Sequence, residues 1–177
     1  MKRINDEVYY NEDEILRVTS ADIQFLKAKA MENPRRRCRL CAHRTPDDAL
    51  HEMLIVHTSA TYVRPHKHPL KNESFHVIEG LMSVVIFDEE GRIRDVIEMG
   101  EYASGRKFFY RLSSASYHTV VVHSQTVVFH EATNGPFNPA DAVYARWAPS
   151  LEDDENVPVF MQELNQRVKQ FIKVKEL

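Results

Sequence analysis

Short runs of β-branched and aromatic residues follow one another from about residue 37 to 148, and they constrain the fold more than any other feature. Turn-forming stretches such as "DEEG" and "LSSAS" separate them, which is typical of antiparallel strands with short connections. This pattern predicts an all-β barrel or sandwich. The runs are "HEMLIVHTSATYV", "SFHVIEGLMSVVIFD", "GRIRDVIEM", "RKFFYRL", "YHTVVVHS" and "QTVVFHEA".

Helical spacing is confined to the two ends of the chain. "TSADIQFLKAKAMENP" starts with the cap-type residues Thr19 and Ser20, carries an apolar stripe and ends at a proline, which predicts a short amphipathic helix. After the acidic stretch "EDDEN", the segment "VPVFMQELNQRVKQFIKVKEL" returns to helical spacing. We expect an N-terminal helical segment over residues 1–36, a β-barrel over 37–150, and an acidic linker with a C-terminal helix over 151–177.

Length and composition fit one soluble domain. The 177 residues suffice for one sizeable core, and 43% hydrophobic with 28% charged residues is ordinary for a globular protein. No apolar run approaches the roughly 18 residues of a membrane span, and the first residues turn acidic where a signal peptide would be apolar. The net charge of −3 gives no reason to expect nucleic acid, and we interpret "PRRRCR" as a solvated face. We expect a cytoplasmic protein without a membrane or nucleic-acid partner.

The two cysteines, Cys38 and Cys41, form a C-x-x-C pattern without the context of a zinc or redox site. No second cysteine pair is present, and the surrounding "RRRCRLCAHR" is typical of an extended segment. In a strand, positions three apart point to opposite faces, so the two sulfurs cannot bind one metal. We expect two free, structural thiols, as in a reducing compartment.

The stretch "RPHKHPLKNESFHVIEG" concentrates possible metal ligands. His66 and His68 are two apart, so on a strand both rings project from one face, and a turn through "PLKN" can return Glu73 to the same side. His118 shares strand parity with the apolar residues Val120 and Val122, so its ring should point into the barrel. The alternative interpretation is a polar strand end with surface histidines.

These four side chains offer nitrogen and oxygen ligands in a set suited to several divalent metals. Three imidazoles and one carboxylate can hold one ion of iron, manganese, nickel, zinc, copper or cobalt, with water in the remaining positions. The sequence therefore predicts one divalent metal ion per chain, without identifying the metal.

The full pattern H-x-H-x4-E-x6-G resembles the first motif of the cupin family. In that motif His66, His68 and Glu73 would be ligands, and Gly80 would serve the turn between two strands. The second cupin motif supplies one more histidine, which by position is His118. The resemblance implies a single-domain cupin, that is, a double-stranded β-helix or jelly-roll barrel. The helical spacing described above adds short N-terminal and C-terminal helices, and the C-terminal helix goes beyond the family's pattern.

A closer resemblance extends over about residues 15–150. The segments "ENPRRRCRLCAHR", "ATYVRPHKHPLKNESFHVIEG", "FDEEGRI", "YHTVV", "FHEATNGPFNP" and "ARWAPSLED" resemble the WbuC-type cupin metalloproteins. That family is associated with bacterial surface-polysaccharide gene clusters. The resemblance implies a small polar ligand, such as a carbohydrate or a sugar-nucleotide precursor.

Glu131 is the candidate for acid or base catalysis. In "QTVVFHEA" it alternates with Val127 and Phe129, so it faces the core if they do. A buried carboxylate is costly unless it is paired or used. It can form a structural salt bridge, for example to an arginine within 35–39, or it can act as the acid, base or substrate anchor.

Three further residues are candidates for substrate binding. Arg64 and Tyr62 share the parity of His66 if the strand continues through Pro65, and Arg64 would then offer a bidentate donor near the metal. Lys71 lies in the loop between the predicted ligands.

Several functions remain compatible with the sequence. The first is a metal-dependent enzyme acting on a small polar molecule, with the metal as a Lewis acid or, if it is iron, as an oxygen activator. The second is a non-catalytic module that binds metal and sugar. The third is a metal-free, epimerase-like cupin that uses His66 or His118 with Tyr117. In each case we expect a homodimer whose contacts include the arginine-rich segment "PRRRCRL".

Overall fold

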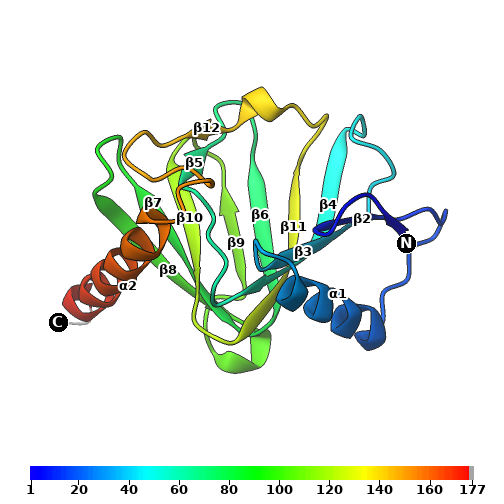
Figure 1. Ribbon diagram of the computed structural model, residues 1–177, viewed down its shortest axis with the longest axis horizontal. Coiled ribbons are helices and arrows are strands. Elements are labelled where there is room, and N and C mark those ends of the chain that lie inside the picture. Colours follow the sequence, from blue (N-terminus) through cyan, green and yellow to red (C-terminus); the bar gives the residue numbers. More distant parts are fainter. Residues whose placement is uncertain (176–177) are drawn as a thin grey trace.

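The structure is a computed structural model that describes residues 1–175. Two sheets face each other and enclose the core, with one helix on the outer side of each sheet (Figure 1). The larger sheet, in spatial order, consists of β1 (Lys2–Arg3), β2 (Val8–Tyr10), β3 (Arg37–Cys41), β4 (Leu50–Thr58), β11 (Thr126–Asn134), β6 (Glu73–Glu79) and β9 (Phe109–Leu112). The smaller sheet consists of β12 (Val143–Tyr144), β5 (His66–Lys67), β10 (Tyr117–Val122), β7 (Leu81–Phe87) and β8 (Ile93–Gly100).

The strand pairing confirms the predicted all-β jelly roll. Among the described strands, all neighbours pair antiparallel except β2 and β3, which are parallel. Residues of alternating parity from both sheets meet in an inner cluster that includes Phe75, Phe129, Val84 and Val120. Gly80 lies in the turn between β6 and β7 with a φ of +83°, a conformation that glycine adopts without strain, as the motif predicts.

The helix α1 (Ser20–Glu32) covers the outer face of the larger sheet. Its cap is Thr19, one of the two predicted positions. The Thr19 side chain accepts a hydrogen bond from the Asp22 backbone, and the Asp22 carboxylate accepts one from the Thr19 backbone at 2.8 Å. This reciprocal capping box satisfies two donors that a helix start leaves free. Leu26 and Ala30 are fully buried against β3 and β4.

The helix α2 (Asn156–Lys175) covers the outer face of the smaller sheet. Its buried residues are Leu164 and Val168, which pack with Val96 of β8 and Phe87 of β7. The predicted C-terminal helix is therefore present, and the residues 176 and 177 of that prediction lie outside the described part. Within residues 1–175, no helix is both long and apolar enough to cross a membrane.

The segment 1–36, which we expected to be helical, also adds two strands to the sheet. β2 pairs with β3 on the side opposite β4, so β3 is an internal strand. The run "VYY" was too short to be recognised as a strand in the sequence. Both backbone edges of β3 are hydrogen-bonded within the chain, so a second copy cannot pair along this strand. The homodimer itself stays a prediction, but its contacts cannot include backbone pairing of β3.

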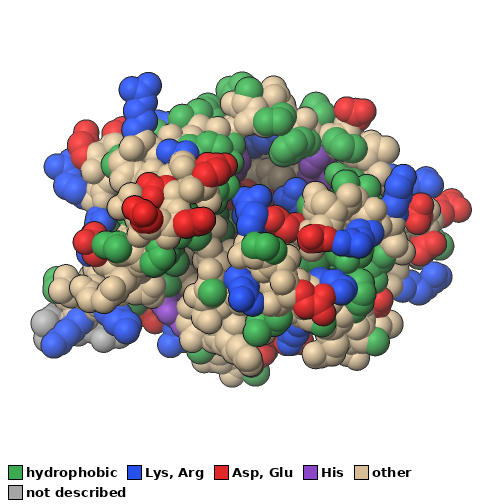
Figure 2. Space-filling view, viewed as in Figure 1, with side chains coloured by type: hydrophobic (Ala, Val, Ile, Leu, Met, Phe, Trp, Pro, Cys, Tyr) green, Lys and Arg blue, Asp and Glu red, His purple; other side chains and the backbone are tan. Residues whose placement is uncertain are grey.

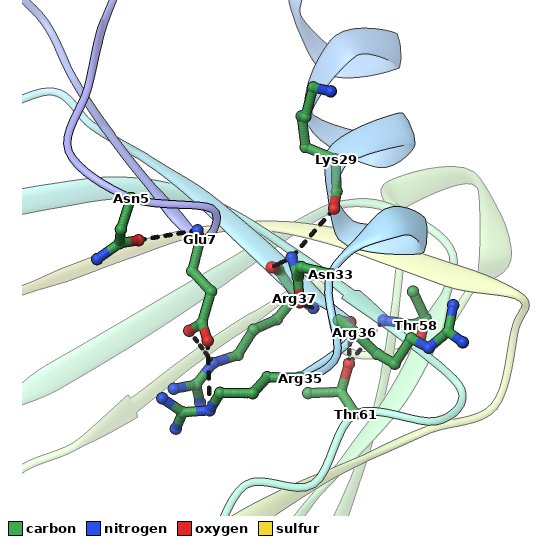
Figure 3. A network of polar contacts seen from close by, with 9 residues as sticks. All are labelled: Asn5, Glu7, Lys29, Asn33, Arg35, Arg36, Arg37, Thr58 and Thr61. Atoms are coloured by element: carbon green, nitrogen blue, oxygen red, sulfur yellow. Dashed lines mark hydrogen bonds and ion pairs between the residues drawn. The ribbon is translucent and has the colours of Figure 1, made fainter.

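Two arginines of this segment, Arg35 and Arg37, are also paired within the chain (Figure 3). The Glu7 carboxylate lies between Arg35 and Arg37, with oxygen to Nε distances of 3.3 and 2.9 Å. The Asn33 side chain donates to the backbone carbonyls of Lys29 and Arg37, which joins the end of α1 to the start of β3. These contacts fix the N-terminal strand to the arginine-rich segment.

Both cysteines are buried and unpaired among the described residues. Cys38 packs under α1, whereas Cys41 belongs to the inner cluster, so the two side chains point to opposite faces of β3 as predicted. Burial raises the pKa of Cys38 to about 11 and also raises the pKa of Cys41. Both groups are therefore thiols at neutral pH.

The thiols should react slowly in the folded protein. A thiol reagent at mildly alkaline pH should modify Cys38 and Cys41 at least roughly tenfold more slowly than it modifies the denatured chain, because both are buried and protonated. The denatured chain, as the control, should yield two thiols. A stoichiometric disulfide after anaerobic purification would contradict this prediction, as would loss of bound zinc on Cys41→Ser.

The packing of α2 can be tested with a matched pair of substitutions. Val168 is 1% exposed and Val159 is 54% exposed on the same helix. Val168→Ala should lower the free energy of unfolding by about 2 kcal/mol, through lost burial and a small cavity. Val159→Ala should change it little. Urea unfolding followed by fluorescence of Trp147, which packs in the same cluster, measures both values. Equal effects would show that α2 is not packed on the sheet.

Candidate metal centre

Three histidines converge at one end of the smaller sheet. His66 in β5 is the register partner of His118 in β10, and His68 follows directly after β5. One ring nitrogen of each histidine lies within 4.8 Å of those of the other two. The H-x-H spacing therefore places both rings on one side, and the strand parity places His118 on the inner face, where it is 2% exposed.

Glu73 approaches this cluster from the opposite sheet. It is the first residue of β6 and is 4% exposed. Its Oε1 lies 2.9 Å from His118 Nε2, and its Oε2 lies 3.8 Å from His68 Nε2. The turn after β5 thus returns the carboxylate to the face that carries the histidines, as the spacing predicts.

Backbone carbonyls orient all three rings. The Nδ1 atoms of His66 and His118 lie 2.9 and 3.0 Å, respectively, from the carbonyl oxygen two residues earlier in the chain. His68 Nδ1 lies 3.3 Å from the carbonyl oxygen of Asp141. A carbonyl can only accept, so in a neutral ring Nδ1 carries the proton and Nε2 keeps its lone pair. Each ring therefore offers Nε2 to the shared space.

The electrostatic environment keeps the carboxylate charged. Burial would raise the pKa of Glu73, but attraction by His118 and the other two histidines outweighs burial and lowers it. Burial would lower the pKa of His118, but the adjacent Glu73 carboxylate raises it. Burial, followed by repulsion from His118, lowers the pKa of His66 to about 4. Burial also lowers the pKa of His68.

The donor set fits a divalent metal ion. Glu73 Oε1 and His118 Nε2 are fully buried, and within the described residues neither makes a hydrogen bond of good geometry, although they are 2.9 Å apart. Buried polar atoms without partners are rare in native proteins and often indicate an ion or water. Neutral imidazoles with one carboxylate suit a first-row transition metal. The residues His66, His68, Glu73 and His118 could hold such an ion.

Glu131 faces the interior, as its parity with Val127 and Phe129 predicts. It is the register partner of Met53 in β4 and Phe75 in β6, both members of the inner cluster. Burial, followed by repulsion from Glu73, raises the pKa of Glu131 to about 8. No ion pair joins it to an arginine within residues 1–175, so the structural salt bridge that we considered is not formed.

The predicted substrate-binding residues make contacts that the sequence did not indicate. The strand does not continue through Pro65, because residues 61–65 are outside regular structure. Arg64 donates to the carbonyl of Ala145 at 3.0 Å and lies over the ring of Tyr144. The Tyr62 hydroxyl donates to the carbonyl of Pro149 at 2.9 Å, which directs it towards the C-terminal segment.

Lys71 is held by the loop that follows β11. Its ammonium group lies 2.6 Å from the carbonyl oxygen of Pro136 and 3.0 Å from an Asp141 carboxylate oxygen. The same Asp141 supplies the backbone carbonyl that orients His68. Lys71 therefore stabilises the loop beside the histidines, a role that its position in the sequence alone did not predict.

Two tyrosines, Tyr144 and Tyr117, lie in strands beside the histidines, and their positions test the epimerase-like alternative. Tyr144 in β12 lies 6.0 Å from His66 between ring centroids, and sequence reasoning missed it because β12 has only two residues. Tyr117 has the opposite parity to His118 and packs against Trp147 in the outer cluster. The pairing of His118 with Tyr117 that an epimerase-like site needs is therefore not formed.

A hollow lies between the two sheets at the end where the histidines gather. Figure 2 shows it beneath the short 3-10 helix η2 (Pro139–Asp141), with histidine and Lys or Arg side chains on its walls. A separate surface hollow of about 590 Å³ lies away from this centre, beside Glu98, Arg106 and Phe109.

Comparison with known proteins supports the fold. The family model described as "Domain of unknown function (DUF6016)" matches residues 18–99, less than half of the chain. No curated protein sequence matches. The structure of protein SO0799 from Shewanella oneidensis is similar, with a TM-score of 0.50, 9% identity, and coverage of 60% of this chain and 72% of that one.

The capsular polysaccharide assembling protein CapF from Staphylococcus aureus is also similar in structure. Its TM-score is 0.50 at 17% identity, with coverage of 63% of this chain. The match spans only 32% of CapF. At such identities these likenesses establish the fold alone, which is a cupin-type jelly roll.

Proposed function

We propose that the protein binds one divalent metal ion through His66, His68, Glu73 and His118. The observation that carries this proposal is the orientation of the three rings, whose Nδ1 atoms all face backbone carbonyls. Their remaining nitrogens meet beside a buried carboxylate that has few other partners. Metal-binding histidines are usually oriented in this way by a hydrogen bond from the other ring nitrogen.

We further propose that the ligand is a small polar molecule, such as a carbohydrate or sugar nucleotide used in bacterial surface-polysaccharide synthesis. The resemblance to WbuC-type cupins supports this, and the structural likeness to CapF, a capsular polysaccharide assembling protein, agrees with it. The metal would supply Lewis-acid chemistry or, if it is iron, oxygen activation. Two free thiols suit the cytoplasm as the place of action.

Within this proposal, Glu131 is the proton-transfer group. Its carboxyl group faces the interior two residues along β11 from Thr133, the register partner of Glu73. With a pKa of about 8 it is mostly protonated at neutral pH and can donate a proton. Three residues remain candidates for substrate binding: Arg64, Lys71 and Tyr62. Of these, Arg64 has the guanidinium group, which can donate two hydrogen bonds to an anionic or polyhydroxy ligand.

The alternative is a module that binds metal and sugar without turnover. Within residues 1–175, Glu131 is the one carboxyl group whose pKa is raised, and no second group of matching chemistry is paired with it. A single displaced group is weak support for catalysis. Chemical conversion of a bound ligand would show that the protein is an enzyme and not a binding module.

Metal content of single variants tests the centre. His66→Ala and His68→Ala should each remove most of the bound metal, because each deletes one of four ligands. His76→Ala is the matched control, since His76 is exposed on the opposite face of β6 from Glu73. Elemental analysis of protein purified without a metal-affinity tag measures occupancy. Equal metal content in all three variants would reject the proposed centre.

We also propose that the protein forms a homodimer, now through β9 instead of β3. β9 is the last strand of the larger sheet and pairs only with β6 among the described strands. Phe109 on this strand is 56% exposed, and Tyr102 nearby is 79% exposed. The unpaired edge of such a strand can pair antiparallel with the same edge of a second copy that is related to it by a two-fold axis.

Light scattering of the full chain tests the dimer. At micromolar concentration the protein should have the mass of two chains, and Phe109→Glu should convert it to a monomer by placing charges at the paired edge. Phe137→Glu, at a residue that is 58% exposed elsewhere, should leave the dimer intact. A monomeric wild-type protein would refute the proposal.

A further inference from the structure

Arg39 lies on the inner face of the larger sheet. Its register partners are Ile55 in β4 and Val8 in β2, and both side chains pack on the inner cluster. Cys41, two residues later on the same strand, also belongs to that cluster. Residues paired across strands share a face, so the Arg39 side chain points between the two sheets.

The Nε atom of the half-buried Arg39 has no hydrogen-bond partner in the described part of the chain, although attraction between Arg39 and the interior Glu131 partly offsets the rise in the pKa of Glu131. The Arg39 Nε is fully buried, and no ion pair among the described residues involves Arg39. Its neighbours differ, because Arg35 and Arg37 both contact the Glu7 carboxylate (Figure 3). A buried donor that stays unsatisfied destabilises the fold, and more so if its group is charged.

Two other polar groups on the same inner face also lack partners. His57, the register partner of Arg37, is 7% exposed and its Nδ1 has no hydrogen bond. The hydroxyl of Tyr110, which is 6% exposed, is likewise free of described partners. Burial lowers the pKa of His57 to about 3, so it adds no second charge beside the guanidinium. The inner face therefore presents three buried polar atoms, Arg39 Nε, His57 Nδ1 and the Tyr110 hydroxyl, that make no hydrogen bond within residues 1–175.

The strand register places Arg39 deeper between the sheets than the histidines. Glu73 pairs with Thr133 on β11, whereas the row of Arg39 and Ile55 continues to Phe129, four residues further along β11. At 3.3 Å per residue, the two rows are about 13 Å apart along the strands. β3 also lies three strands from β6, about 14 Å at 4.8 Å per strand, so Arg39 and Glu73 are about 20 Å apart along the sheet and a ligand that contacts both must be extended.

We propose that Arg39 binds the anionic group, a carboxylate or a phosphate, of a small organic ligand whose other end reaches the histidine centre. Such a ligand supplies the charge and the acceptors that the guanidinium lacks. A sugar nucleotide has the extended shape and the anionic groups that this separation requires. This inference rests on the proposed function, because it identifies the class of ligand for the same interior space.

Calorimetric titration of the metal-loaded full chain tests the assignment. The probes are inorganic phosphate and succinate at constant ionic strength, with glucose as the uncharged comparison. At least one anion should bind, and Arg39→Gln should weaken its binding by roughly tenfold or more, the effect of one charge-assisted hydrogen bond. Arg111→Gln removes an equal charge from an exposed position on β9 and should leave affinity unchanged. Binding of phosphate alone or succinate alone identifies the anionic group.

Two further measurements keep the outcomes distinct. Arg39→Lys keeps the positive charge but lacks the planar guanidinium group, so it should show an intermediate loss of affinity for the anion. This variant still tests the inference if Arg39→Gln does not fold. Metal content is measured for each variant and should equal that of the wild type. Anion binding that is equal in wild type and both Arg39 variants overturns the inference, as does the lack of binding of either anion. Absence of metal from the wild type, with Arg39-dependent anion binding retained, overturns the proposed function alone.

Discussion

The hydrogen bonds between histidine Nδ1 atoms and backbone carbonyls are the interactions on which the candidate centre depends. Two of them join a ring to the carbonyl just two residues earlier, so the strand conformation itself sets the direction of Nε2. The third comes from Asp141, in the loop that Lys71 holds in place. Two of the carbonyls lie just before β5 and β10 and the third lies in a braced loop, so the rings are oriented before any ion arrives, which reduces the entropy lost on binding.

Strand parity predicted most of this site. His66, His68 and His118 were placed correctly because a period of two leaves little freedom in a sheet with one buried face, and the same rule placed Glu131 and the two cysteines. The jelly roll followed from the spacing of short apolar runs. These predictions required only local sequence and the assumption of an unbroken strand.

The remaining features depended on contacts between distant segments. β2 has three residues and joins the sheet only through its parallel pairing with β3, so its own sequence carries almost no signal. Residues 61–65 precede β5 without regular structure, so strand parity did not predict that the Tyr62 hydroxyl donates to the carbonyl of Pro149. Arg39 forms no ion pair with Glu7, because this carboxylate from the N-terminal segment pairs with Arg35 and Arg37. Sequence spacing does not report such competition between arginines for one carboxylate.

The attachment of the N-terminal strand also has a consequence for dynamics. β1 and β2 lie at the border of the larger sheet, and β2 is held there by a short ladder to β3. Segments with so few contacts open locally at a free-energy cost far below that of global unfolding. Each opening would take Glu7 away from Arg35 and Arg37, so the electrostatic potential along β3 would alternate between a partly neutralised and a strongly positive state. Amide hydrogen exchange in β2 would therefore report how often the arginine-rich strand is unshielded.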